Sequence, residues 1–172
     1  MTRYQAVATF VDANNNRYDK LVVGAIITKS DHDSTSRILL LKRAAHEPIY
    51  PNIFEIPGGE VETTDTTILD AVKREVHEET GLTVTNVLGN VESFHYAMEK
   101  VETPEGRKVT TRKTSMQLNF VCEVEGYDFR IDPREHSEGV WATKGEVAGL
   151  EVTASMREVV REAFEWVKAR TG

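Results

Sequence analysis

The stretch REVHEETGL, residues 74–82, decides how the middle of this chain folds. It gathers three carboxylates, those of Glu75, Glu78 and Glu79, just ahead of Gly81. Glycine is the preferred residue in the left-handed position after a helix, so the stretch predicts a helix that ends before Gly81. Acidic side chains in the last turn face the negative end of the helix dipole, at a cost of roughly 0.3–1 kcal/mol each. A positive charge must therefore offset them.

The predicted helix runs from residue 66 to residue 80. Thr67 serves as its N-cap, with Asp70 three residues later in an approximate capping box. At about 100° per residue, the carboxylates share one face with the apolar residues Ile68, Ala71 and Val72, and that face should approach the protein body. The outer face then carries Asp70, Lys73, Arg74 and His77.

Bound metal ions are the interpretation that best explains this charge. Lys73 and Arg74 lie elsewhere on the helical wheel, so a salt bridge does not account for it. Hard divalent cations such as Mg²⁺ or Mn²⁺ prefer carboxylate oxygens. We therefore expect a Mg²⁺ or Mn²⁺ site on Glu75, Glu78 and Glu79. The alternative is an ordinary solvated acidic patch.

The rest of the chain reads as short strands and one further helix. Apolar runs and period-two alternation predict strands at residues 4–11, 21–28, 38–41, 84–91, 93–98, 116–124 and 140–142, with a turn at 12–16. The run at 38–41 suits a strand buried on both faces, and the alternation at 116–124 a half-buried one. Residues 153–169 have apolar side chains at helical spacing. This order of elements predicts an α/β or α+β sandwich.

Length and charge limit the kind of protein. The 172 residues suffice for one domain with a hydrophobic core, so we expect 1–172 to be a single domain. The net charge of -7 argues against a nucleic-acid partner. The single cysteine, Cys122, cannot form an intrachain disulfide, which favours the cytoplasm, and its place on an apolar strand face predicts a core residue. No apolar run is long enough to span a membrane, and no targeting signal is visible.

Together with Pro57-Gly58-Gly59-Glu60-Val61-Glu62, the acidic stretch resembles the Nudix box, the signature of the Nudix hydrolase family. The family pattern is Gly, five residues, Glu, seven residues, then Arg-Glu-aliphatic-any-Glu-Glu-any-Gly-aliphatic. The second half matches at every specified position from Arg74 to Leu82. The first half holds one extra residue. Counting from Gly59 gives Asp65 where the family has Glu, and Asp65 is either a substitute for that glutamate or a helix-capping residue.

The resemblance implies a fold and a reaction. The fold is an α/β/α sandwich with a mixed central sheet, on which the loop and helix of the box pack. The reaction is hydrolysis of the diphosphate bond of a nucleoside diphosphate linked to another moiety, by water that Mg²⁺ or Mn²⁺ activates. The substrate is then a small nucleotide, and the sequence does not say which one. The sequence also leaves open whether the chain forms a homodimer. The alternative is a nucleotide-sensing module that binds without cleavage, motivated by the extra residue and the missing glutamate.

The resemblance also assigns roles to residues. It makes Glu75, Glu78, Glu79 and the backbone of Gly59 the metal ligands, with Glu75 and Glu78 also in the catalytic set. Arg74 orients a box glutamate. The general base comes from the box or from a later loop, where Glu138 is the first candidate and Glu135 the second.

Other positions are candidates for substrate contacts. Arg43 and Gly58 are expected to bind the substrate. An aromatic platform for a base, or else simply core, is expected among Tyr50, Phe54, Phe94, Tyr96 and Trp141. No histidine is expected to act as a ligand, neither His77 on the outer helix face nor His95 or His136.

Overall fold

The computed structural model describes residues 18–103, 105 and 108–171. The strand predicted at 4–11 and the turn predicted at 12–16 lie outside these residues. The strands are β1 (Lys20–Ser30), β2 (Ser36–Arg43), β3 (Phe54–Glu55), β4 (Gly58–Glu60), β5 (Val84–Glu102), β6 (Val109–Val124) and β7 (His136–Thr143). The helices are α2 (Ile68–Thr80), α3 (Lys144–Val147) and α4 (Ala154–Thr171).

The strands form a mixed sheet around β1. The order is β3-β2-β1-β6-β5, with β4 paired to β1 and β7 paired to β2. The β1 and β6 strands run parallel from the Lys20–Ser115 pair to the Ile27–Cys122 pair. The other described strand pairs are antiparallel. This arrangement matches the predicted mixed central sheet.

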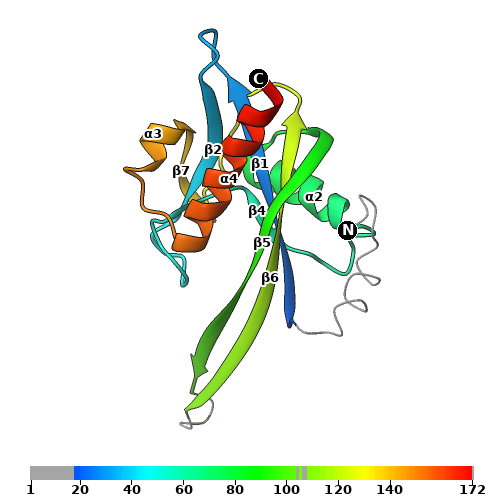
Figure 1. Cartoon of the computed structure of the whole chain (residues 1–172). Helices are drawn as coiled ribbons and strands as arrows, with labels where there is room; N and C mark the ends of the chain where they lie inside the picture. Colours follow the sequence, from blue (N-terminus) through cyan, green and yellow to red (C-terminus); the bar gives the residue numbers. More distant parts are fainter. Residues whose placement is uncertain (1–17, 104, 106–107, 172) are drawn as a thin grey trace.

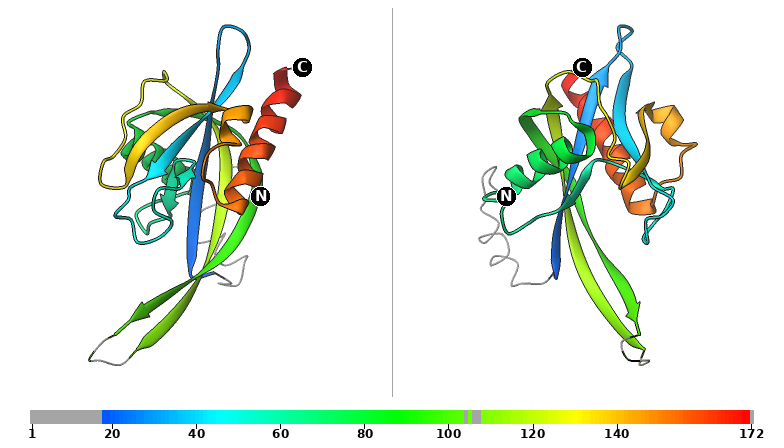
Figure 2. Two further views of the ribbon diagram at one scale, coloured as in Figure 1. Left: turned by 90° about the vertical axis from the view of Figure 1, so that its left-hand side faces the viewer. Right: turned by 180° about the vertical axis from the view of Figure 1, so that it is seen from behind.

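Two long helices cover opposite faces of this sheet. Figure 1 has α4 in front of the sheet and α2 behind it, and the view from behind in Figure 2 reverses that order. Apolar residues of α2 and α4 accordingly belong to two separate core clusters. The predicted α/β/α sandwich is confirmed. In the described part of the chain, no helix is both long enough and apolar enough to cross a membrane.

Both ends of α2 form as the sequence predicts. The Thr67 hydroxyl accepts a hydrogen bond from the Asp70 N–H, and the Asp70 carboxylate accepts one from the Thr67 N–H, which completes a capping box. Gly81 follows the helix in the left-handed conformation, with φ of 68°, and its N–H donates to the His77 carbonyl. These caps fix where the acidic last turn lies.

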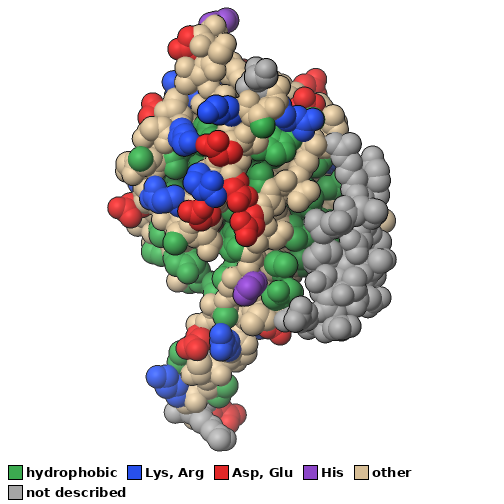
Figure 3. Space-filling view, in the orientation of Figure 1, with side chains coloured by type: hydrophobic (Ala, Val, Ile, Leu, Met, Phe, Trp, Pro, Cys, Tyr) green, Lys and Arg blue, Asp and Glu red, His purple; other side chains and the backbone are tan. Residues whose placement is uncertain are grey.

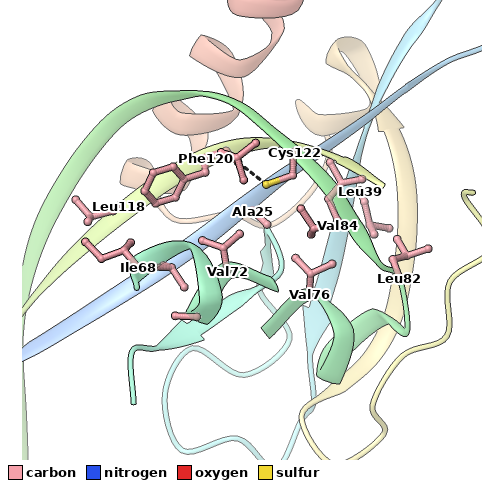
Figure 4. Close-up of a cluster of buried hydrophobic side chains, with 14 of the residues drawn as sticks. Ala25, Leu39, Ile68, Val72, Val76, Leu82, Val84, Leu118, Phe120 and Cys122 are labelled. Carbon is pink, nitrogen blue, oxygen red and sulfur yellow. Dashed lines mark hydrogen bonds between the residues drawn. The ribbon is translucent and has the colours of Figure 1, made fainter. Parts of the chain in front are cut away.

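The α2 side of the sheet holds the first core cluster. Figure 4 shows Ile68, Val72 and Val76 of α2 on one side of this cluster and strand residues such as Phe120 on the other. Cys122 belongs to the same cluster and is 1% exposed, which confirms it as a core residue.

The opposite face of β6 differs from the prediction. The alternation at 116–124 predicted one face in water, yet Ser115, Gln117 and Asn119 on that face are all buried. Val121 on the same face packs in the second cluster with residues of α4. A row of polar side chains therefore lies inside the molecule.

The β5 and β6 strands pair from Val84–Val124 to Glu102–Val109, and their outer part projects from the body as a ribbon (Figures 1 and 2). The two strands predicted at 84–91 and 93–98 are one strand, because a register shift between Val91 and Phe94 interrupts the side-chain alternation without ending the pairing. This shift lies where β5 passes α4.

Candidate active site

Two glycines of β4 bring the backbone against the acidic end of α2. The Gly58 N–H donates to Oε2 of Glu79 at 2.8 Å. With φ of +157°, a Cβ on Gly58 would lie 2.1 Å from the carbonyl oxygen of Val23. A Cβ on Gly59 would lie 2.6 Å from the carboxylate of Glu75. Both close approaches require a residue without a side chain.

Arg74 links Asp65, in the loop ahead of α2, to two acids of the helix itself. It binds the Asp65 carboxylate through Nε at 3.1 Å and through Nη2 at 2.9 Å. Its Nη1 donates to Glu75 at 2.7 Å and to Glu78 at 3.3 Å. The helical-wheel prediction that Arg74 points away from the carboxylates was wrong, because the long arginine side chain spans the rotation between helix positions. The contact between Arg74 and a box glutamate, which the resemblance implied, is present. Hydrogen bonding to Asp65 raises the pKa of Arg74 and lowers that of Asp65.

The three box carboxylates do not share one environment. Glu75 and Glu79 are 9% and 4% exposed, whereas the side chain of Glu78 is 56% exposed. Burial raises the pKa of Glu79 well above its usual value, and the charges of Glu55, Glu75 and Glu135 raise it further. Burial also raises the pKa of Glu75, against the opposing effect of Arg74. Of the three carboxylates predicted to share one helix face, two are therefore buried and one faces solvent.

His136 is a buried residue of the site that the sequence did not reveal. It begins β7, is 2% exposed and pairs with Arg43 of β2. Its Nε2 lies 3.5 Å from Oε1 of Glu55 and 3.9 Å from Oε1 of Glu79. Within the described part of the chain, neither ring nitrogen has a hydrogen-bond partner. Only the long-range pairing of β2 with β7 brings it here, so local periodicity carried no signal for it.

The two loop acids lie in different places. The charge of Glu135 contributes to the raised pKa of both Glu75 and Glu79. Glu138 is half exposed and lies 3.7 Å from Nζ of Lys42, on the neighbouring strand. The structure thus brings the second candidate for the base, Glu135, to the box and pairs the first, Glu138, with a lysine.

Arg43 lies where the box meets the loop at residues 44–53. Its Nη1 binds Glu55 at 2.8 Å, its Nη2 binds Glu47 at 2.7 Å and its Nε donates to the Ile49 carbonyl at 2.9 Å. A guanidinium has five N–H groups, so further donors remain for a substrate. The observed contacts of Arg43 hold the loop in place. Contact between Arg43 and the substrate stays a prediction.

Two adjoining cavities open beside the box. One, of about 290 Å³, is lined by Gly58, Gly59 and Glu60 of β4, and the other, of about 210 Å³, by Tyr50, Phe54 and Phe94. The residues that line both are Arg43, Glu55, Tyr96, Met98, Gln117 and Met156. The aromatic candidates other than Trp141 thus border the cleft. Trp141 instead packs edge-on against Phe129, with ring centroids 6.2 Å apart.

The family model described as NUDIX domain matches residues 19–166 of the chain. The chain belongs to the NUDIX domain family. The m7GpppN-mRNA hydrolase NUDT17 of Danio rerio is 32% identical to this NUDIX chain over 114 residues, which are 63% of this chain and 37% of that relative. The chain thus spans well under half the length of that relative.

Solved structures of NUDIX proteins have the same fold. The mMutator MutT protein of Bacillus halodurans has a TM-score of 0.55 at 29% identity, over 83% of this chain and 80% of that one. The NUDIX domain of Shewanella oneidensis NrtR, crystallised with ADP-ribose, has a TM-score of 0.64 at 16% identity, over 97% and 99% of the two chains. At that identity the likeness shows the fold alone.

The donor atoms of the NUDIX box suit a divalent cation. Two buried carboxylates with raised pKa lie against the β4 glycines, that of Glu75 beside Gly59 and that of Glu79 beside the Gly58 N–H. Hard oxygen donors of this kind fit Mg²⁺ or Mn²⁺. Among the described residues, no three His, Cys, Asp or Glu side chains converge in a ready metal-binding arrangement. The Arg74 and Gly58 hydrogen bonds hold the two carboxylates in their present positions.

Proposed function

We propose that the chain is a divalent-metal-dependent hydrolase that cleaves the diphosphate bond of a nucleoside diphosphate linked to another moiety. One observation carries this proposal. The two buried carboxylates of Glu75 and Glu79 lie against Gly58 and Gly59 at the wall of a cleft, where burial disfavours their negative charge. The curated relative named above is itself a hydrolase of m7GpppN-mRNA, and the Shewanella NUDIX domain binds ADP-ribose. Both ligands contain a nucleotide joined through phosphates.

Glu75, Glu79 and the Gly59 backbone are the proposed holders of Mg²⁺ or Mn²⁺, with the exposed Glu78 as a further ligand. When bound, the cation supplies positive charge for the phosphate oxygens and lowers the pKa of a bound water. Because the protein and the substrate are both anionic, this positive charge is also what allows them to associate.

The chain's own groups then perform positioning and proton transfer. Arg74 holds the Glu75 carboxylate through its 2.7 Å hydrogen bond, and Asp65 fixes the other side of the guanidinium. The Gly58 N–H fixes Glu79 in the same way. Our candidate for the base that takes a proton from the attacking water is Glu135, because its charge helps to raise the pKa of both Glu75 and Glu79. Glu138 is the alternative for this role.

The partner is a small nucleotide rather than a nucleic acid. On the face in Figure 3, acidic and basic side chains are interspersed, and no broad basic patch covers it. With a net charge of -7, long-range attraction for a polyanion is weak. We also propose that 1–172 is a single domain, in the cytoplasm, where the buried thiol of Cys122 stays reduced.

Hydrolysis of a diphosphate panel tests the function. The panel contains ADP-ribose, a sugar nucleotide, a dinucleoside polyphosphate, an m7GpppN cap analogue and a nucleoside triphosphate, each with Mg²⁺ or Mn²⁺. We expect release of a nucleoside monophosphate or phosphate from at least one compound. We also expect Glu79→Gln to lose at least about a hundredfold in activity, because even residues that only hydrogen-bond to a metal ligand are worth about 10- to 100-fold. Glu158→Gln, an equal charge change on the exposed side of α4, is the matched control.

Binding of panel members without turnover would contradict the hydrolase assignment. That outcome would instead identify the chain as a nucleotide sensor, the alternative that the extra residue between Gly59 and Arg74 motivated.

A further inference from the structure

The cleft beside the box has a polar end and an apolar end. The polar end contains Gly58, Gly59 and Glu60, next to the proposed metal-binding carboxylates. The apolar end lies between β5, the start of α4 and the loop at residues 44–53. Each cavity alone is smaller than the usual range of about 300–1,000 Å³ for ligand pockets, whereas both together reach it. The shape therefore suits an extended ligand with a charged part and an apolar part.

The apolar end is built for a flat ring. Phe94 and Tyr96 lie on the same face of β5 with ring centroids 5.9 Å apart, and Met156 of α4 lines the same cavity. Tyr50 lines it from the loop and is 53% exposed. An exposed tyrosine beside a partly buried aromatic pair offers surfaces on which a ring can stack.

A buried amide lies at the boundary between the two ends. Gln117 lines both cavities and is 9% exposed. Its Nε2 donates to Oδ1 of Asn119 at 3.0 Å, and Nδ2 of Asn119 donates to the Glu92 carbonyl at 2.9 Å. Because a carbonyl can only accept, this relay fixes the orientation of both amides. Among the described residues, it leaves Oε1 and the second N–H of Gln117 for a ligand.

Gly24 makes room for this relay. A Cβ on Gly24 would lie 2.7 Å from Oδ1 of Asn119 and 3.0 Å from Nε2 of Gln117. The parallel pairing of β1 with β6 places Gly24 opposite Asn119. A fixed, buried amide with an unused donor and acceptor is typical of a site that reads the edge of a base.

The loop that carries Tyr50 is held in a strained conformation. Tyr50 has a φ of 50°, in the left-handed region that bulky residues seldom adopt, and Asn52, a residue type that tolerates this region, has a φ of 62°. Arg43 holds the loop, since its Nε binds the Ile49 carbonyl and its own carbonyl accepts from the Asn52 N–H. Strain that is maintained in this way is common at ligand sites.

We infer that the apolar end is a nucleobase subsite, in which Tyr50, Phe94 and Tyr96 contact the faces of the base and Gln117 hydrogen-bonds to its polar edge. This inference rests on the proposed function, because it assigns the diphosphate to the polar end. It names the nucleoside as the part of the substrate that the chain selects, and the second moiety as the part that it tolerates.

Calorimetric titration with AMP, GMP, UMP, CMP and ribose 5-phosphate, at fixed Mg²⁺, tests the inference. We expect one nucleotide or more to bind at least about tenfold more tightly than ribose 5-phosphate, as base stacking on an aromatic side chain allows. Tyr50→Leu should weaken the binding of every nucleotide by about fivefold or more and leave the binding of ribose 5-phosphate unchanged. Tyr127→Leu, which removes a tyrosine of similar exposure outside the cleft, is the matched control.

Gln117→Leu should reduce the differences among the four nucleotides to about twofold or less. A readout on the unaltered chain guards against a folding defect in this variant. The chain has two glutamines, Gln5 and Gln117, so the side-chain amide signal of Gln117 can be assigned by NMR. That signal should shift on addition of the preferred nucleotide and not on addition of ribose 5-phosphate.

Equal affinity for ribose 5-phosphate and all four nucleotides would overturn the subsite, as would an unmoved Gln117 amide signal. Either result could accompany full hydrolytic activity, in which case the proposed function stands and the subsite fails. Base-selective binding without hydrolysis would give the opposite result, a subsite that stands while the proposed function fails.

Discussion

The carboxylate of Glu79 carries its charge in surroundings that oppose it. The residue is 4% exposed, and Glu55, Glu75 and Glu135 all add to the rise in its pKa that burial causes. Among the residues that the structure describes, the hydrogen bond that favours the charged form comes from the Gly58 N–H. A carboxylate in this position weakens the folded state unless a cation binds to it.

The sign of the pH effect follows from the raised pKa. The folded state binds the Glu79 proton more tightly than the unfolded state, whose carboxyl has a pKa of about 4.3. The free energy of unfolding should therefore fall as the pH rises from about 4.3 through the raised pKa. In the presence of a chelator, we expect Glu79→Gln to reduce this slope and to raise the thermal unfolding midpoint at pH 7.

Thermal unfolding at several pH values, with Glu158→Gln as the control, measures this effect. Glu158 is exposed on α4, away from the box, so Glu158→Gln should keep the slope of the parent chain. A Glu79→Gln variant with the slope of the parent chain would contradict the assigned cause.

Cys122 provides a second test at this scale. Burial raises the pKa of its thiol to about 12. At pH 8 the thiolate is then scarce, and the side chain is 1% exposed, so alkylation by iodoacetamide should be negligible in the folded chain. Mass spectrometry should find complete labelling only in denaturant. Rapid labelling of the folded chain would place the thiol outside the core.

Individual residues of the site were only partly predictable from the sequence. The burial of Glu79 and Glu75 followed from their sharing a helix face with Ile68 and Val72. The reach of Arg74 to Glu75 did not follow from the helical wheel, which gives directions and ignores side-chain length, although the resemblance implied it. Nor did the position of His136, because pairing between strands that are distant in sequence brings it to the box.

At the scale of elements, α2 depends on its N-terminal cap. Thr67→Ala removes the hydroxyl that accepts the Asp70 N–H, and such caps are worth about 1 kcal/mol. We expect the free energy of unfolding in urea to fall by about that amount. Thr66→Ala changes the exposed neighbour and should have little effect. Equal losses in the two variants would show that the capping box does not stabilise the helix.

The β4 strand depends on Gly58. A Cβ there would meet the Val23 carbonyl at 2.1 Å, at a φ that side chains seldom adopt. Gly58→Ala should lower the free energy of unfolding by roughly 1–3 kcal/mol, the cost of an unfavourable backbone conformation. Gly145→Ala is the control, because nothing lies within 4 Å of a Cβ at that position. A neutral Gly58→Ala would contradict the tight packing of β4 on β1.

The longer elements were predictable because their patterns extend over several turns or pairs. The helices at 68–80 and 154–171 and the strand at 36–43 lie within about two residues of the ranges predicted at 66–80, 153–169 and 38–41. The strands β3 and β4, of two and three residues, and the short α3 have too few residues to show a period. The second buried face of β6 was missed because its polar residues looked solvent-facing, and tertiary packing covers them.

At the scale of the whole molecule, the sheet collects the parts of the site from distant segments. The parallel pairing of β1 with β6 brings Gln117 beside the β4 glycines, and the pairing of β2 with β7 brings His136 beside Glu79. The fold class and the box could be predicted from the sequence. The cleft was not, because its walls come from β4, β5, β6, α4 and a loop that no local pattern joins.

The central claim is that the buried carboxylates of α2 bind a divalent cation. Calorimetric titration of Mn²⁺ into the chain, into the double variant Glu75→Gln and Glu79→Gln, and into Glu158→Gln measures this directly. We predict saturable binding to the parent chain and to Glu158→Gln, and none to the double variant. Equal Mn²⁺ binding by all three proteins, or no binding by the parent chain, would contradict the claim.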